Sequence, residues 1–161
     1  MKIETRSGAD DGSLVSNPYI LLLEDRDEDV ELTIRAFRKA HILNEIVVKR
    51  DGVEALEFLT DLGSVEGGST SPLLTLLDIN TPRMSGITLL EHVRDLSHLR
   101  YVPVVMLTSS AEESDLLACY DRGANSYLRK PVAHGEFTSM VERLGMYWVL
   151  TNETPPGSPS A

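Results

Sequence analysis

The chain has 161 residues, of which 42% are hydrophobic and 25% charged, proportions typical of one soluble globular domain. Its net charge of −10 argues against direct binding of nucleic acid, because neutralising phosphates requires clustered lysines and arginines. The single cysteine, Cys119, excludes an internal disulfide, and no apolar run is long enough for a membrane span or a secretion signal. We therefore expect a cytoplasmic protein without a membrane partner.

The two ends of the chain differ in composition from its middle. Residues 1–17 mix Gly, Ser, Asp and Asn without periodicity and predict a flexible leader. Residues 151–161, TNETPPGSPSA, are rich in proline and predict a disordered tail. The segment 18–150 has no internal repeat and predicts a single folded domain.

Five short apolar runs lie in this domain, and each is followed by a segment with helical periodicity. Several runs are almost wholly apolar, which is typical of parallel strands covered on both faces. The runs occupy residues 19–23, 46–48, 73–77, 103–107 and 125–128. The helical segments carry apolar residues three and four positions apart: Val30, Ile34 and Phe37; Ala55, Phe58, Leu59 and Leu62; Leu89, Leu90, Val93 and Leu96; Leu116, Leu117 and Tyr120; and Phe137, Met140, Val141, Leu144 and Trp148.

Capping residues mark the ends of some helices. Asp51 with Glu54, and Ser110 with Glu113, have the spacing of an N-cap and its reciprocal acid. The glycines that stand where the second and fourth helices should end are Gly63 and Gly123.

Five strands alternating with five helices predict an α/β fold, a doubly wound parallel sheet with right-handed crossovers. In such a sheet, ligands bind beyond the carboxyl ends of the strands, where the winding reverses. Polar residues that follow the strands are therefore the first candidates for function.

Acidic, hydroxyl and basic side chains stand at four of the predicted strand ends. The first strand ends at Glu24 and Asp25, the third at Asp78, the fourth at Thr108 and the fifth at Lys130. Each residue taken alone is an ordinary cap, turn or strand-exit residue. Taken together, at one edge of a parallel sheet, they would bring three carboxylates, a hydroxyl and an ammonium into a small volume.

This combination of groups suits phosphoryl transfer. Clustered carboxylates repel one another unless a cation compensates them, and Mg²⁺ prefers oxygen ligands supplied by carboxylates, water and phosphate. Thr108 and Lys130 supply donors for phosphoryl oxygens, and phosphoryl transfer depends mainly on positioning and charge neutralisation. The pattern predicts a Mg²⁺-dependent site in which Asp78 is the nucleophile and forms an aspartyl phosphate.

Four segments hold these residues: LLLEDRDED, LLDINTPRMSG, VVMLTSS and GANSYLRKP. In them the sequence resembles the receiver domains of two-component response regulators, and the resemblance spans about residues 18–150. It implies a flavodoxin-like sheet with the strand order 2-1-3-4-5. It also implies a phosphoacceptor rather than an enzyme, with at most slow self-phosphorylation from small donors and slow self-dephosphorylation.

The resemblance implies a metal site around the phosphoacceptor. Asp78 would be the phosphoacceptor, and Asp25 and Asp78 would be side-chain ligands of Mg²⁺. Glu24 would lie nearby, often bound through water, and Asn80 would contribute its backbone carbonyl.

The resemblance also implies how the site would switch. Thr108 would be the hydroxyl that follows the phosphoryl group, and Lys130 would be its counter-ion. Tyr127 would be the aromatic residue that turns inward on activation. The peptide bond between Lys130 and Pro131 would be cis, which an X-Pro bond permits at low cost.

A narrower resemblance concerns the partners. The segments EDVELTIRAF, NEIVVKRDGVEALEFL, GANSYLRKPV and LGMYWVLTNETPP look like the stand-alone regulators that serve phytochrome-type histidine kinases. A sensor histidine kinase of this type would then be the phosphodonor. The signal would pass by protein–protein contacts through the fourth helix, fifth strand and fifth helix, roughly residues 110–148, a surface that often forms a homodimer in this family.

Some alternatives stay open at this level. Arg26, directly after the acidic pair, either weakens metal binding or points outward, and we expect the second. A phosphohydrolase would normally need a second acid where the chain has Asn80, and turnover of a phosphoester would identify it. A binding module that is never phosphorylated would keep the fold with a silent site, and metal-dependent phosphorylation would exclude it.

Overall fold

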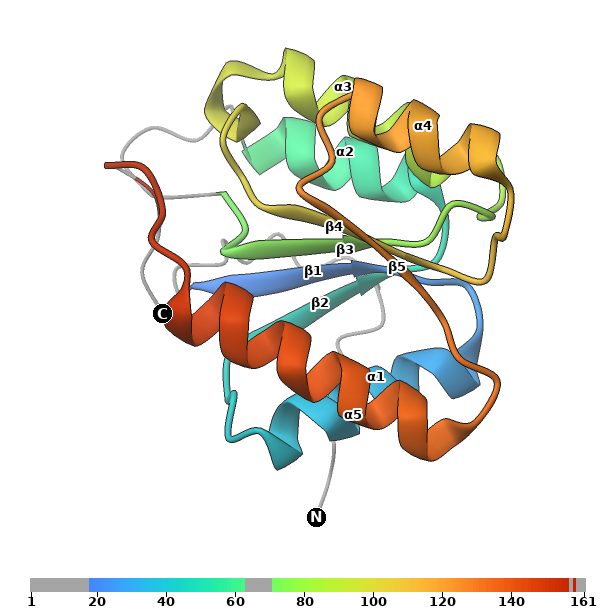
Figure 1. Cartoon of the computed structure of the whole chain (residues 1–161). Helices are drawn as coiled ribbons and strands as arrows, with labels where there is room; N and C mark the ends of the chain where they lie inside the picture. Colours follow the sequence, from blue (N-terminus) through green and yellow to red (C-terminus); the bar gives the residue numbers. More distant parts are fainter. Residues whose placement is uncertain (1–17, 63–70, 157, 159–161) are drawn as a thin grey trace.

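The computed structural model describes residues 18–62, 71–156 and 158, and these form a five-stranded parallel sheet of order β2-β1-β3-β4-β5 (Figure 1). This is the predicted order. The strands are β1 (Tyr19–Leu23), β2 (Glu45–Lys49), β3 (Leu74–Leu77), β4 (Val104–Thr108) and β5 (Ser126–Arg129). Since all five run the same way, their carboxyl ends lie along one edge.

Helices cover both faces of the sheet, as Figure 1 shows: α1 and α5 lie on one face, and α2, α3 and α4 on the other. Their bounds are α1 (Asp27–Lys39), α2 (Gly52–Leu62), α3 (Gly86–Asp95), α4 (Glu113–Asp121) and α5 (His134–Gly145). A short 3-10 helix (Ser97–Leu99) precedes β4. The doubly wound α/β architecture predicted from the sequence is therefore confirmed.

The sheet separates two apolar cores. Alternate residues of β1 serve opposite faces: Leu21 and Leu23 pack with α2 and α3, whereas Ile20 and Leu22 pack with α1 and α5. All five residues of β1 are buried, which explains why the strand reads as a continuous apolar run. Each buried leucine or isoleucine contributes about 1.5–3 kcal/mol of transfer free energy, so the central strands anchor the carboxyl edge firmly.

Helix ends agree in part with the predicted caps. Asp51 caps α2, because its Oδ1 accepts a hydrogen bond from the amide of Glu54 at 2.8 Å. Gly123, with φ of 92°, follows the end of α4 as predicted, and Gly63 lies outside the described residues. The Ser110 cap is wrong: α4 begins at Glu113 after an N-cap at Glu112. Ser110 remains in the preceding loop, where its amide donates to Thr108 Oγ1.

The predicted long fifth helix changes its winding near its end. After Gly145, the residues from Met146 to Thr151 form a π-helix, and the amide of Asn152 donates to the carbonyl of Tyr147 at 2.7 Å. The widened turn buries Val149 and leaves Met146 and Leu150 exposed. It also carries regular structure one residue past the predicted domain boundary at 150. Among the described residues, no helix combines the length and apolarity needed to cross a membrane.

Candidate functional site

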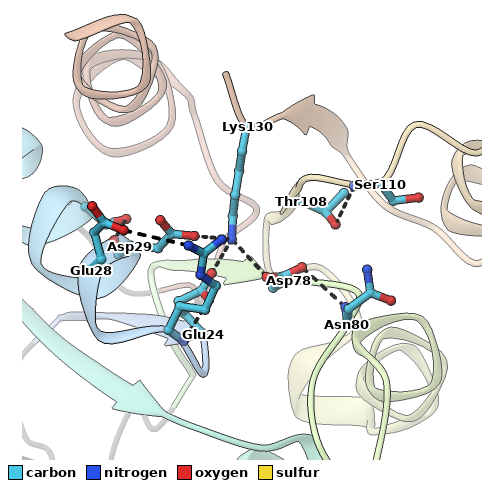
Figure 2. A network of polar contacts seen from close by, with 10 residues as sticks. Glu24, Glu28, Asp29, Asp78, Asn80, Thr108, Ser110 and Lys130 are labelled. Carbon is cyan, nitrogen blue, oxygen red and sulfur yellow. Dashed lines mark hydrogen bonds and ion pairs between the residues drawn. The ribbon is translucent and has the colours of Figure 1, made fainter. Parts of the chain in front are cut away.

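The carboxyl edge of the sheet brings the predicted site residues together. Glu24 and Asp25 directly follow β1, Asp78 follows β3, Thr108 is the last residue of β4, and Lys130 follows β5. Figure 2 shows the Lys130 side chain reaching from the end of β5 to the acidic residues. Residues from four strands thus form one site, because β1, β3, β4 and β5 are consecutive neighbours in the sheet.

The ammonium of Lys130 is the centre of the polar network. It forms ion pairs with Glu24, with Asp29 Oδ2 at 2.9 Å and with Asp78 Oδ2 at 2.9 Å. The side chains of Lys130, Glu24 and Asp78 are at most 7% exposed. Each charge is removed from water, so each depends on the others for stabilisation.

Asp29 was not among the residues predicted from the sequence. It lies in the first turn of α1, which places it four residues beyond Asp25, and its side chain reaches Lys130. The acidic run EDRDED contained the only signal, but an acid in the first turn of a helix is also expected from the helix dipole alone.

Burial and ion pairing shift the pKa values of Glu24 and Lys130 in opposite directions. Burial raises the pKa of Glu24 to about 7, against the hydrogen bond and charge of Lys130, which lower it. Burial also acts to lower the pKa of Lys130, but the hydrogen bond to Glu24 and the charge of Asp78 outweigh it and raise that pKa above its ordinary value. Lys130 therefore stays protonated at neutral pH.

A divalent cation fits the donor set at this edge. Carboxylate oxygens of Glu24, Asp25 and Asp78 all lie within 4.8 Å of one another, and Asp25 is exposed to solvent. Lys130 contacts three carboxylates, those of Glu24, Asp29 and Asp78, and Asp25 adds a fourth to the same cluster, so negative charge is in excess. All these ligands are hard oxygens, which Mg²⁺ prefers and which allow Mn²⁺ as well.

The other side of Asp78 carries the hydroxyl and amide groups, as Figure 2 shows. The amide of Asn80 donates to Asp78 Oδ1 at 3.3 Å. Thr108 is fully buried, and its Oγ1 accepts from the amide of Ser110 at 3.2 Å. The hydroxyl of the half-buried Tyr127 donates to the carbonyl of Ser110 at 3.2 Å. Ser110 thus connects the two predicted switch residues, Thr108 and Tyr127.

Two expectations about neighbouring groups have different outcomes. The Lys130–Pro131 bond was expected to be cis, but the described residues, which include both of these, contain no cis peptide bond. The bond is trans, the isomer that X-Pro favours by about 0.5–1 kcal/mol. Arg26 points outward as expected: its side chain is 62% exposed and its Nη2 lies 3.7 Å from Glu28 Oε2. Only its amide contacts the site, donating to Glu24 Oε1 at 3.0 Å.

Comparison with known proteins identifies one family. The family model for the response regulator receiver domain matches residues 20–142. The chain is 35% identical over 142 residues to the response regulator Rcp1 of Synechocystis sp., covering 87% of this chain and 96% of Rcp1. It is 36% identical over 152 residues to the probable methanogenesis regulatory protein FilR2 of Methanothrix harundinacea, covering 92% of this chain and 96% of FilR2.

Solved structures agree with this match. The phosphorylated cyanobacterial phytochrome response regulator RcpA superimposes with a TM-score of 0.78 at 30% identity, over 86% of this chain and 99% of RcpA. The Mn²⁺-bound form of Rcp1 superimposes with a TM-score of 0.77 at 33% identity, also over 86% of this chain and 99% of Rcp1.

Proposed function

Since this chain belongs to the response regulator receiver domain family of two-component signalling, we propose that Asp78 accepts a phosphoryl group from a sensor histidine kinase in a Mg²⁺-dependent reaction. The observation that carries the proposal is the contact between Lys130 and Asp78 beside the cluster of Glu24, Asp25 and Asp78. It combines a nucleophilic carboxylate, a fixed cation and a set of ligands for a metal within one small site.

Each residue of the site has its own role in the proposed phosphoryl transfer. A carboxylate oxygen of Asp78 attacks the phosphorus, and the bond between phosphorus and the donor's leaving group breaks. Lys130 and the hydroxyl of Thr108 donate hydrogen bonds to the phosphoryl oxygens. Glu24, Asp25, Asp78 and the carbonyl of Asn80 would hold Mg²⁺. The bound ion would neutralise charge on the transferring group.

The experiment is phosphorylation by a small donor. The protein is incubated with acetyl phosphate and Mg²⁺, and its intact mass is measured beside a Mg²⁺-free sample and Asp78→Asn. We expect one phosphoryl adduct that needs Mg²⁺ and is absent from the variant. An adduct on Asp78→Asn would refute the assignment of Asp78. Absence of an adduct, together with failure to bind beryllofluoride, would favour a silent binding module.

We further propose that the phosphodonor is a phytochrome-type histidine kinase. The support comes from RcpA, described as a cyanobacterial phytochrome response regulator, and from the 44% identity to the bacteriophytochrome response regulator AtBRR, whose TM-score is 0.62. Phosphotransfer from a panel of purified, autophosphorylated kinases tests this. A phytochrome-type kinase should transfer to Asp78 fastest at equal concentrations, and a faster transfer from an unrelated kinase would refute the pairing.

The output would be a change in protein–protein contacts. Thr108 would move toward the phosphoryl group, and because Ser110 contacts both Thr108 and Tyr127, the movement would reach α4, β5 and α5. We propose that this surface, residues 110–148, forms a homodimer. Light scattering with and without beryllofluoride measures the oligomeric state, and Tyr127→Ala should weaken any dimer that depends on phosphorylation. A monomer under both conditions would refute the dimer.

A further inference from the structure

Arg83 has an unusual backbone conformation close to the proposed phosphoacceptor. Its φ is 63°, in the left-handed region, which costs a residue other than glycine roughly 1–2 kcal/mol. It lies in the loop between β3 and α3, residues 78–85, which begins with Asp78 itself. A strained residue at such a position is retained only where surrounding contacts hold it.

Asp51 provides the contact that holds Arg83. One guanidinium nitrogen of Arg83, Nη2, donates to Oδ1 and Oδ2 of Asp51 at 2.9 and 2.8 Å. The same carboxylate caps α2 by accepting from the amide of Glu54. The hydrogen bond from Arg83 lowers the pKa of Asp51, so the carboxylate stays charged at neutral pH. This contact connects the start of α2 to the loop, although the Arg83 side chain is 57% exposed.

Close backbone packing leaves the loop little freedom on its inner side. A Cβ on Gly52 would lie 2.3 Å from the carbonyl oxygen of Met84, and one on Gly86 would lie 2.0 Å from that of Asp78. The amide of Gly86 donates to the carbonyl of Ile79 at 2.9 Å. Met84 is thus packed against the start of α2, and the end of the loop against Asp78 and Ile79, in the same loop that contains Asn80.

We propose that Asp51 and Arg83 form a positioning pair that fixes the loop containing Asn80, and thereby sets the affinity for the divalent cation. Neither residue is placed among the metal ligands. The inference rests on the proposed function, because it assumes that Glu24, Asp25, Asp78 and the Asn80 carbonyl hold Mg²⁺.

The test is a calorimetric titration of the full chain with Mg²⁺, comparing the wild type with Asp51→Asn and Arg83→Ala. Asparagine is also a good N-cap, so Asp51→Asn keeps the cap of α2 while removing the charge that holds Arg83. We expect each variant to bind Mg²⁺ about tenfold more weakly, the lower end of the effect of removing outer groups that support a metal site.

The direction in which Mg²⁺ affinity changes in Asp51→Asn and in Arg83→Ala distinguishes a positioning role from a simple effect of charge. Removing a positive charge near a cation site would strengthen metal binding, and removing a negative charge would weaken it. Weaker binding in both variants supports positioning, whereas tighter binding in Arg83→Ala overturns it. The double variant should be no weaker than the poorer single variant, since both changes act on the same contact.

Two further variants serve as controls: Arg83→Gly for backbone strain, and Arg122→Ala for the loss of an ion pair far from the site. Glycine removes the contact but accepts a positive φ without strain, so a variant that folds stably and still binds Mg²⁺ weakly supports the proposal. Wild-type affinity in Arg83→Gly would overturn it. Arg122→Ala breaks the surface ion pair to Glu91 and should leave the affinity for Mg²⁺ unchanged.

If the wild type itself fails to bind Mg²⁺, the proposed metal site fails. If the wild type and the positioning variants bind equally, only the positioning pair fails.

Discussion

The ammonium of Lys130 lies 2.9 Å from Oδ2 of Asp78, although 52 positions separate the two residues in the chain. The contact joins the ends of β3 and β5, which are not neighbours in the sheet, across the end of β4. Because Lys130 also pairs with Glu24 and Asp29, it holds together acidic groups that would otherwise repel one another.

Replacing Lys130 by methionine tests this role. The variant leaves three buried carboxylates without their cation, and breaking a buried ion pair costs about 3–5 kcal/mol. We expect a lower melting temperature that saturating Mg²⁺ raises more in the variant than in the wild type. Lys39→Met, which removes an exposed partner of Glu142, is the control and should change little. Equal stability of Lys130→Met and the wild type without Mg²⁺ would contradict the role.

Gly86→Ala tests the close approach of α3 to Asp78, the proposed phosphoacceptor. The added Cβ would lie 2.0 Å from the carbonyl oxygen of Asp78, so the backbone of the site must move. We expect a loss of about 1–3 kcal/mol of stability and slower phosphorylation by acetyl phosphate. Gly135→Ala in α5 meets nothing within 4 Å and should be neutral or stabilising by up to about 1 kcal/mol. Equal stability and equal phosphorylation rates of Gly86→Ala and Gly135→Ala would show that the site tolerates a side chain at position 86.

Thr75→Val tests an unpaired hydroxyl in the core. Thr75 is 1% exposed in β3, and among the described residues its Oγ1 has no hydrogen-bond partner. A buried polar group without a partner costs about 1–3 kcal/mol, so valine should increase the free energy of unfolding measured in urea. Thr33→Val offers a comparison, because the equally buried Thr33 hydroxyl donates to the carbonyl of Asp29 at 2.7 Å. The prediction fails if Thr75→Val is the more destabilising of the two.

The Asp51–Arg83 pair should contribute to stability in a pH-dependent way. The pKa of Asp51 is lowered in the folded protein, first by the hydrogen bond from Arg83. The unfolded chain therefore binds the proton more readily, and the stability that the charged form provides is present above the unfolded pKa of about 3.9. It is lost as the pH falls through the folded value. Urea unfolding of the wild type and Asp51→Asn should differ at pH 7 and converge in strong acid. A difference in the free energy of unfolding that stays the same at every pH would contradict a contribution from the charge of Asp51.

Much of the fold and of the site followed from the sequence because both depend on local patterns. The continuous apolar runs identified the strands, and the order of strands and helices placed Glu24, Asp25, Asp78, Thr108 and Lys130 at one edge. In a parallel sheet that edge is shared, so knowing which residue follows each strand was enough to group them.

Other features were decided only by the tertiary structure. The side chain of Asp29 reaches Lys130 because of the rotation of α1 about its axis and its distance from the sheet. The acidic run in the sequence determines neither of these. Ser110 has the spacing of a cap, but Thr108 holds it in the loop. Asp51 and Arg83 meet across 32 positions through the packing of two turns. Such contacts depend on how separate elements pack in space, whereas strand ends depend on the chain's own periodicity.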